Sequence, residues 1–184
     1  PEDLAGVPVT VGYQSGSHYS TIQGLEPFLK EEEINLHFGG LLMGRLDLLV
    51  DREVPAGNAF GAPMYILEQL GFRKILDTTF MIATMVPPNV DREDVVKYFE
   101  ALKRAQADID LRHDLYTHYF LNELPERYQS VADTRRFGPG ERIVFEPYSK
   151  EIFDGTREWV IERDIFPKEK VGADGYDHAV VTAD

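Results

Sequence analysis

The stretch VPVTVGYQSGSHY, residues 7–19, decides how the chain folds. Its first valines alternate with other residues up to Val11, and this period of two is typical of a β-strand. A short turn rich in glycine and serine follows, and Ser17 is a suitable N-cap for a helix over residues 18–30. The stretch therefore predicts a strand, a tight turn and a helix, the repeating unit of α/β folds.

Strand and helix patterns continue to alternate over the first ninety residues. Strands are expected over residues 34–38, 54–60, 73–76 and 78–86, and helices over residues 41–50 and 63–70. The dipeptide Pro87-Pro88 ends the alternation. The pattern predicts an α/β fold whose first part, residues 3–88, is a Rossmann-like lobe with a mostly parallel sheet that binds a ligand.

The second half of the chain carries mainly helical patterns. Helices are expected from Asn89 or Asp91 to about residue 106, over residues 111–124 and 128–136, and from Ser149 to residue 164. A short strand is expected over residues 143–145. This predicts a helical C-terminal region over residues 89–167, followed by a polar tail, residues 168–184, that is expected to be flexible.

Composition excludes several classes of protein. The 184 residues include 19 Lys and Arg and 32 Asp and Glu, so the formal charge is −13. This charge argues against binding of nucleic acid or of an anionic membrane surface. The absence of cysteine excludes disulfides, thiol nucleophiles and cysteine-bound metals. No apolar run approaches the ~20 residues of a membrane span, and the first residues do not form a signal peptide, so membrane insertion is not expected.

The turn after the first strand is the first candidate ligand site. Free backbone N–H groups and the positive end of the helix dipole favour an anion there, and serine hydroxyls can add donors. An ordinary capped turn without a ligand remains the alternative, because short glycine patterns are weak signals. The candidate ligand-binding residues here are Ser15, Gly16, Ser17, His18 and Tyr19.

A second small-residue turn follows the strand expected over residues 54–60. Asn58 offers a hydrogen-bonding amide and Phe60 a ring for stacking, although Phe60 can equally belong to the core. The five histidines lack the spacing of a helical metal site, so neither a metal nor a cofactor is predicted. If the chain is an enzyme, His18 is the candidate proton donor, but no second acid or base is identifiable.

The order of these pieces resembles one family. DLAGVPVTVG, residues 3–12, is similar to the opening of the second lobe of type-2 periplasmic binding proteins, in the branch that binds nitrate, sulfonates and pyrimidine precursors. EQLGFR, residues 68–73, resembles the helix and strand that close this lobe, and residues 78–86 resemble its return strand. Residues 95–110 and 148–167 are similar to two of its later helices.

The resemblance implies a solute-binding component of an ABC transporter, periplasmic or extracellular, that binds a small organic or anionic ligand in a cleft between lobes. An ABC permease is then the expected partner; a cytoplasmic location stays open. A first lobe would precede residue 3, so half of the cleft is expected on a missing segment or a second chain. Some relatives are enzymes, which leaves an aromatic-acid decarboxylase or an interaction subunit as alternatives. Ala62-Pro63 departs from the acidic residue often found before that proline, and the lack of cysteine excludes a desulfinase.

Overall fold

We analysed a computed structural model of the chain, which describes residues 1–138, 140, 142–143, 145–172 and 174–180. The chain forms two compact units. Unit 1 comprises Pro1–Ile82 and Ala107–Arg142, and unit 2 comprises Ala83–Gln106 and Ile143–Asp184. The sequence analysis expected a lobe over residues 3–88 and a separate helical region over residues 89–167. In the structure the first segment of unit 1 ends at Ile82, and residues 107–142 also belong to this unit.

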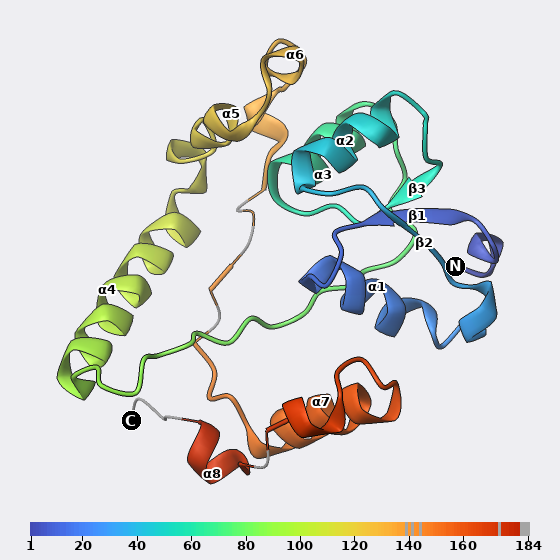
Figure 1. Cartoon of the computed structure of the whole chain (residues 1–184). Helices are drawn as coiled ribbons and strands as arrows, with labels where there is room; N and C mark the ends of the chain where they lie inside the picture. Colours follow the sequence, from blue (N-terminus) through green and yellow to red (C-terminus); the bar gives the residue numbers. More distant parts are fainter. Residues whose placement is uncertain (139, 141, 144, 173, 181–184) are drawn as a thin grey trace. The chain divides into compact units, whose positions relative to one another are not determined.

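Unit 1 is built on a three-stranded parallel sheet (Figure 1). Its strands are β1 (Pro8–Val11), β2 (Asn35–Phe38) and β3 (Ala56–Gly57), and β1 lies in the middle. The mixed α/β fold and the parallel sheet predicted from the sequence are confirmed. The strand expected over residues 54–60 shrinks to two residues, because Val54 N–H bonds to Leu48 O and Pro55 has no N–H.

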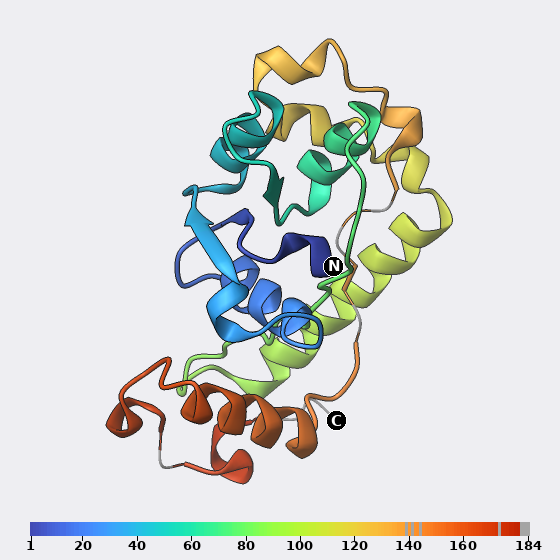
Figure 2. The ribbon, with the colours of Figure 1, turned by 90° about the vertical axis from the view of Figure 1, so that its right-hand side faces the viewer.

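Helices cover both faces of this sheet. α1 (Gly16–Leu25) connects β1 to β2 and lies on one face, whereas α2 (Leu42–Val50) and α3 (Gly61–Gln69) lie on the other (Figures 1 and 2). The connection from β1 to β2 and the connection from β2 to β3 run in opposite directions across the sheet, so right-handed crossovers place α1 and α2 on opposite faces. α1 starts before the predicted residue 18 and ends before residue 30, because Pro27 cannot continue the helical hydrogen bonds.

The hydrophobic core of unit 1 lies around α2 and α3. Their side chains alternate at helical spacing between this core and solvent. The rings of Tyr65 and Phe137 stack with centroids 5.1 Å apart, which ties residues 107–142 to α3. The core residues are Leu46, Leu49, Ala62, Tyr65, Ile66, Leu67, Leu124, Tyr128 and Phe137.

The two strands expected over residues 73–76 and 78–86 are absent, and that prediction is wrong. Residues 76–80, which we call the α1 strap, instead lie along α1. A Cβ on Gly24 would lie 2.6 Å from Thr78 Cγ2, and a Cβ on Gly16 would lie 2.3 Å from the Phe80 ring. Thr78 and Phe80 therefore occupy the space left by two helical glycines, rather than a place in the sheet beside the two-residue β3.

α4 (Arg92–Leu111) begins after Asp91, whose carboxylate accepts the Glu93 N–H at 2.8 Å. Its residues 92–106 belong to unit 2, and its last residues belong to unit 1. Short helices and turns make up the rest of unit 1. The single helix predicted over residues 111–124 is wrong, because Arg112 leaves the helical conformation at φ −142°. A 3₁₀ turn (His113–Leu115), α5 (Tyr119–Glu123), α6 (Glu126–Gln129) and a 3₁₀ turn (Thr134–Arg136) follow. Two further 3₁₀ turns are Glu2–Leu4 and Glu31–Glu33.

Unit 2 contains α7 (Lys150–Glu162) and α8 (Tyr176–Ala179), with a 3₁₀ turn (Lys168–Lys170) between them. The predicted N-cap of α7 is confirmed: Ser149 Oγ accepts the Ile152 N–H at 3.2 Å. The Phe153 ring contacts Tyr148 and Tyr176, with centroids 6.2 Å and 5.9 Å away. Ile143 and Phe145 lie outside any strand, and residue 144 is outside the described residues. The flexibility of residues 168–184 stays a prediction.

Within the described ranges, no helix combines the length and the apolar character needed to cross a membrane.

Candidate functional site

Three loops meet at the carboxyl edge of the sheet in unit 1. They follow β1, β2 and β3 and lead into α1, α2 and α3. In open α/β sheets ligands bind outside the carboxyl ends of the strands, where neighbouring connections run to opposite faces. The strand order β2-β1-β3 places that point next to β1. The loop after β1 carries the first predicted ligand site.

The serines of this first loop hold the loop itself. Ser15 Oγ donates to Gly12 O at 2.8 Å, so its proton is used, and it lies 2.8 Å from Ser17 Oγ. Ser17 Oγ therefore donates to Ser15 and accepts the Gly12 N–H at 3.0 Å. Ser15, not the predicted Ser17, is the N-cap residue of α1. Because both hydroxyl protons are committed, the donors expected from these side chains are not free for a ligand.

Arg45 of α2 lies against this serine network. Its side chain is only 4% exposed, and its Nη1 donates to Ser17 Oγ at 2.6 Å. The Nε–H is buried without a hydrogen-bond partner, and within the described residues no carboxylate pairs with the guanidinium. Burial lowers the pKa of Arg45, but a guanidinium stays charged in proteins. Among the described residues, Arg45 is therefore a buried cation whose hydrogen-bond partner is a neutral hydroxyl.

A second unsatisfied polar atom lies beside Arg45. Thr10 Oγ1, on the central strand, is buried and has no hydrogen-bond partner. Gly39 brings the two side chains together: a Cβ on Gly39 would lie 2.2 Å from Thr10 Oγ1 and 3.1 Å from Arg45 Cγ. Buried polar groups are nearly always hydrogen-bonded. Thr10 Oγ1 and Arg45 Nε are two such exceptions on neighbouring side chains. They indicate that the protein groups here do not supply all the hydrogen bonds that these atoms need.

An aromatic cluster, which we call the aromatic collar, lies near the carboxyl ends of β1 and β2. It consists of Tyr13, His18 and Phe38, with the His18 ring 5.2 Å from Phe38 and Phe38 5.0 Å from Tyr13. Tyr13 is 65% exposed and Phe38 is 49% exposed. The predicted residue Tyr19 stacks on His18 with centroids 4.7 Å apart.

His18 also shapes the loop. Its Nδ1 accepts the backbone N–H of Gln14 at 3.2 Å, and Gln14 adopts a left-handed conformation with φ +48°. Burial lowers the pKa of His18, which favours the neutral imidazole that this hydrogen bond requires. His18 therefore supports the first loop in its neutral form.

The two residues predicted in the loop after β3 have different roles. Asn58 Nδ2 donates to Thr21 Oγ1 and to Thr78 Oγ1, both at 3.1 Å, so its amide joins α1 to the α1 strap. Phe60 lies next to the buried cation, with its ring centroid 5.9 Å from Arg45 Cζ. Asn58 is committed to the fold, whereas Phe60 belongs to the surroundings of Arg45.

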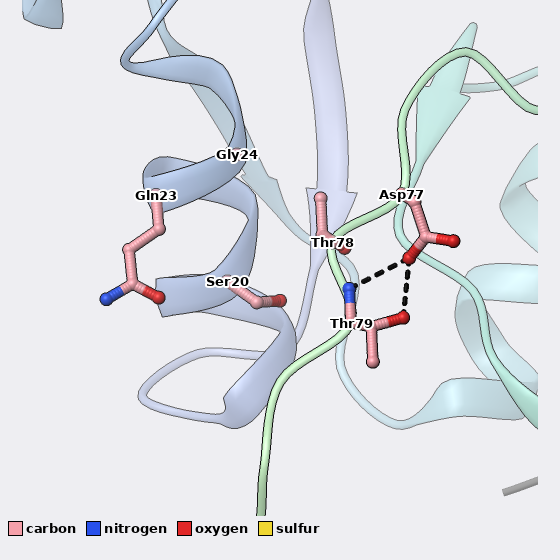
Figure 3. A pocket seen from close by; sticks show the side chains of 6 residues that line it. All are labelled: Ser20, Gln23, Gly24, Asp77, Thr78 and Thr79. Atoms are coloured by element: carbon pink, nitrogen blue, oxygen red, sulfur yellow. Dashed lines mark hydrogen bonds between the residues drawn. The ribbon is translucent and has the colours of Figure 1, made fainter. Parts of the chain in front are cut away.

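A shallow polar pocket lies between α1 and the strap (Figure 3). The Asp77 carboxylate accepts both the N–H and the hydroxyl of Thr79, at 3.0 Å and 2.5 Å. The hydroxyl of Thr79 lowers the pKa of Asp77 most strongly. The lining residues are Ser20, Gln23, Gly24, Asp77, Thr78 and Thr79, and Figure 3 shows the Gln23 amide directed away from the strap.

The structure thus brings Ser15, Gly16, Ser17, His18 and Phe60 to the carboxyl edge, and gives Asn58 a bracing role. The sequence analysis missed Arg45, Thr10 and Gly39. One signal was present: Arg45 interrupts the apolar run of residues 41–50. Among the described residues, no group of three or more histidines and carboxylates could hold a metal ion.

Comparison of the chain with protein-family models, with curated proteins and with solved structures found no match.

Proposed function

We propose that the chain binds a small anionic ligand at the carboxyl edge of its sheet, as a Rossmann-like lobe of a solute-binding protein. The observation that carries this proposal is the buried guanidinium of Arg45, which has a neutral serine as its partner among the described residues. A buried charge without a counter-charge is costly. An anion that binds there pairs with the buried charge and removes this cost. The free energy recovered in this way adds to the affinity for the ligand.

Two further features support an anion at this place. Gly16 and Ser17 are the first residues of α1, where backbone N–H groups lack helical acceptors and the dipole favours negative charge. The free edge of the Arg45 guanidinium, Nε with Nη2, can donate two parallel hydrogen bonds to one anion. In this proposal the Phe60 ring, whose centroid lies 5.9 Å from Arg45 Cζ, turns aside to admit the ligand.

The resemblance to type-2 periplasmic binding proteins extends the proposal to the protein's setting. In that setting the chain serves transport, with a permease as partner and the periplasm or the cell exterior as its location. A second lobe or chain would close over the carboxyl edge. The binding experiment below tests the ligand site without depending on this setting.

The test is calorimetric titration of the 184-residue chain with acetate, benzoate, sulfate and phosphate, repeated with Arg45→Met and Arg73→Met. Arg73 is an exposed arginine of the same unit, so its variant carries the same change of charge. We expect at least one anion to bind and Arg45→Met to weaken it by about 10- to 100-fold, the value of a charge-assisted hydrogen bond. Arg73→Met should bind as the wild type does.

Two results would overturn the proposal. One is a folded wild-type chain that binds none of the four anions. The other is binding that Arg45→Met and Arg73→Met weaken to the same small extent, because the effect would then come from net charge alone.

A further inference from the structure

The polar pocket of Figure 3 lies between two close contacts of α1 with the α1 strap. Gly16, Ser20 and Gly24 follow one another at intervals of four residues, so they share one face of the helix. The strap packs tightly at both glycines, with Phe80 at Gly16 and Thr78 at Gly24. Between these contacts, beside Ser20, the strap leaves a hollow of about 200 Å³.

Two hydroxyl groups that line this pocket have unused protons. Asn58 Nδ2 donates to Ser20 Oγ at 3.4 Å and to Thr78 Oγ1 at 3.1 Å, so both oxygens act as acceptors. Among the described residues, neither hydroxyl donates to a protein group in turn. Ser20 is only 5% exposed, and Figure 3 shows its side chain directed from α1 toward the strap. A buried hydroxyl that lacks an acceptor indicates a place where an oxygen from outside the protein binds.

The carboxylate of Asp77 supplies an acceptor at the same pocket. Its Oδ1 accepts both the N–H and the hydroxyl of Thr79. Its Oδ2 has one contact, with Lys74 Nζ at 3.4 Å, and both of these side chains are more than half exposed. A carboxylate oxygen accepts two hydrogen bonds, and an exposed ion pair of this kind is weak. Asp77 Oδ2 is therefore open to a donor from a ligand.

These groups together favour a ligand that both accepts and donates hydrogen bonds. The lining is polar apart from the threonine methyl groups and Gly24, so an apolar molecule buries little apolar surface there. The negative charge of Asp77 disfavours an anion, and a cation would leave the two hydroxyl protons without an acceptor. A hydroxyl group accepts one hydrogen bond and donates another, so neighbouring hydroxyl groups of one ligand satisfy both kinds of protein group.

We propose that this pocket binds a small polyhydroxy compound, whose hydroxyl groups accept hydrogen bonds from Ser20 and Thr78 and donate one to Asp77. The hollow has the volume of about six water molecules, which suits a short polyol or a pentose. None of these three residues takes part in the site at Arg45. The inference therefore goes beyond the proposed function and does not depend on it.

The experiment titrates the isotope-labelled full chain with xylose, erythritol, tetrahydropyran and methylammonium and follows the backbone amide resonances by NMR. Tetrahydropyran has the ring of xylose without its hydroxyl groups, and methylammonium is a small cation. We expect xylose and erythritol to shift the resonances of residues 20–24 and 77–79 until they saturate, with dissociation constants on the order of millimolar. Tetrahydropyran and methylammonium should leave these resonances unchanged.

The same titrations are made with Ser20→Ala and Asp77→Asn. Asparagine keeps an oxygen that accepts from Thr79, so this variant should retain the strap. Removal of one hydroxyl donor should weaken xylose about 3- to 10-fold, and loss of the charged acceptor about 10-fold or more. The matched controls are Ser130→Ala and Asp3→Asn, which make the same changes at exposed residues of unit 1 and should bind as the wild type does.

Three results would overturn the proposal. If neither xylose nor erythritol gives a saturable shift at residues 20–24 and 77–79, the pocket holds water alone. If tetrahydropyran or methylammonium binds as tightly as xylose, hydroxyl groups are not what the pocket recognises. If the pocket variants and their controls weaken xylose equally, the sugar binds elsewhere. The comparison of probes uses the wild-type chain, so it decides the matter even where a variant fails to fold.

Discussion

Arg45 and Leu46 are consecutive residues of α2, and both are buried, with 4% and 1% of their surface exposed. Leu46 belongs to the hydrophobic core with Leu49 and Ile66, where burial stabilises the fold. Arg45 lies at the carboxyl edge with an unsatisfied Nε, and burial of this polar group destabilises the folded protein. Burial of Leu46 therefore stabilises the folded protein. Burial of Arg45 costs free energy, which an anion that binds there would recover.

The core should show the largest effect of a single substitution. Ile66 is fully buried, so Ile66→Ala should lower the free energy of unfolding by about 2–5 kcal/mol through lost burial and a cavity. Urea unfolding followed by circular dichroism measures this. The affinity of the folded protein for benzoate should not change. An Ile66→Ala variant that keeps full stability but no longer binds benzoate would contradict the distinction between a core that stabilises the fold and an edge that binds the ligand.

Substitutions at two helical glycines should have effects of intermediate size. Gly24→Ala places a Cβ 2.6 Å from Thr78 Cγ2 and should destabilise unit 1 by about 1–3 kcal/mol. Gly155→Ala in α7 meets no atom within 4 Å and should stabilise its helix by up to ~1 kcal/mol. Unfolding followed by Trp159 fluorescence reports on α7, and circular dichroism reports on the whole chain. If both substitutions change the free energy of unfolding in the same direction, the α1 strap does not pack on α1 as described.

The smallest effect is expected from pH. Because burial lowers the pKa of His18, the unfolded chain takes up this proton at a higher pH than the folded chain. The contribution of His18 to stability is therefore complete above the unfolded pKa of about 6.5 and is lost as the pH falls from there through the lower pKa of the folded chain. Protonation also removes the acceptor that Nδ1 offers to the Gln14 N–H.

The measurement is the free energy of unfolding of the wild type and of His18→Gln between pH 7.5 and about 5.5, the range in which histidine titrates. The wild type should lose more stability than the variant on acidification, and the other four histidines cancel in the difference. Identical slopes would mean that His18 is not held in its neutral form.

Local patterns were sufficient to predict much of the fold. Alternating valines placed β1, and Ser149 marked the start of α7, because both signals depend on neighbours in the sequence. The residues after β3 misled the analysis: residues 78–86 are rich in strand-forming side chains, yet Thr78 and Phe80 pack on glycines of α1. That packing joins residues more than fifty positions apart, and no local pattern contains it.

The candidate ligand-binding residues of the first loop stay a prediction, and the structure gives several of their side chains partners within the protein. A strand, a glycine-rich turn and a helix pointed to Ser15, Ser17 and His18, and the fold places them at the carboxyl edge. The sequence could not show that the serine protons are used within the loop, or that Arg45 reaches Ser17 across 28 residues. Nor could the sequence show the bonds of Asn58 to Thr21 and Thr78, because these are also long-range.

The most direct test of the stored cost at Arg45 is the unfolding free energy of wild type, Arg45→Met and Arg73→Met, without ligand and with benzoate. Without ligand, we expect Arg45→Met to be at least as stable as Arg73→Met, since methionine removes an unpaired buried charge. With benzoate at 100 times its dissociation constant, the wild type and Arg73→Met should gain about 2.7 kcal/mol and Arg45→Met almost nothing. A ligand-free Arg45→Met that loses about 3–5 kcal/mol, as when a satisfied buried pair is broken, together with an undiminished response to benzoate, would contradict the central claim.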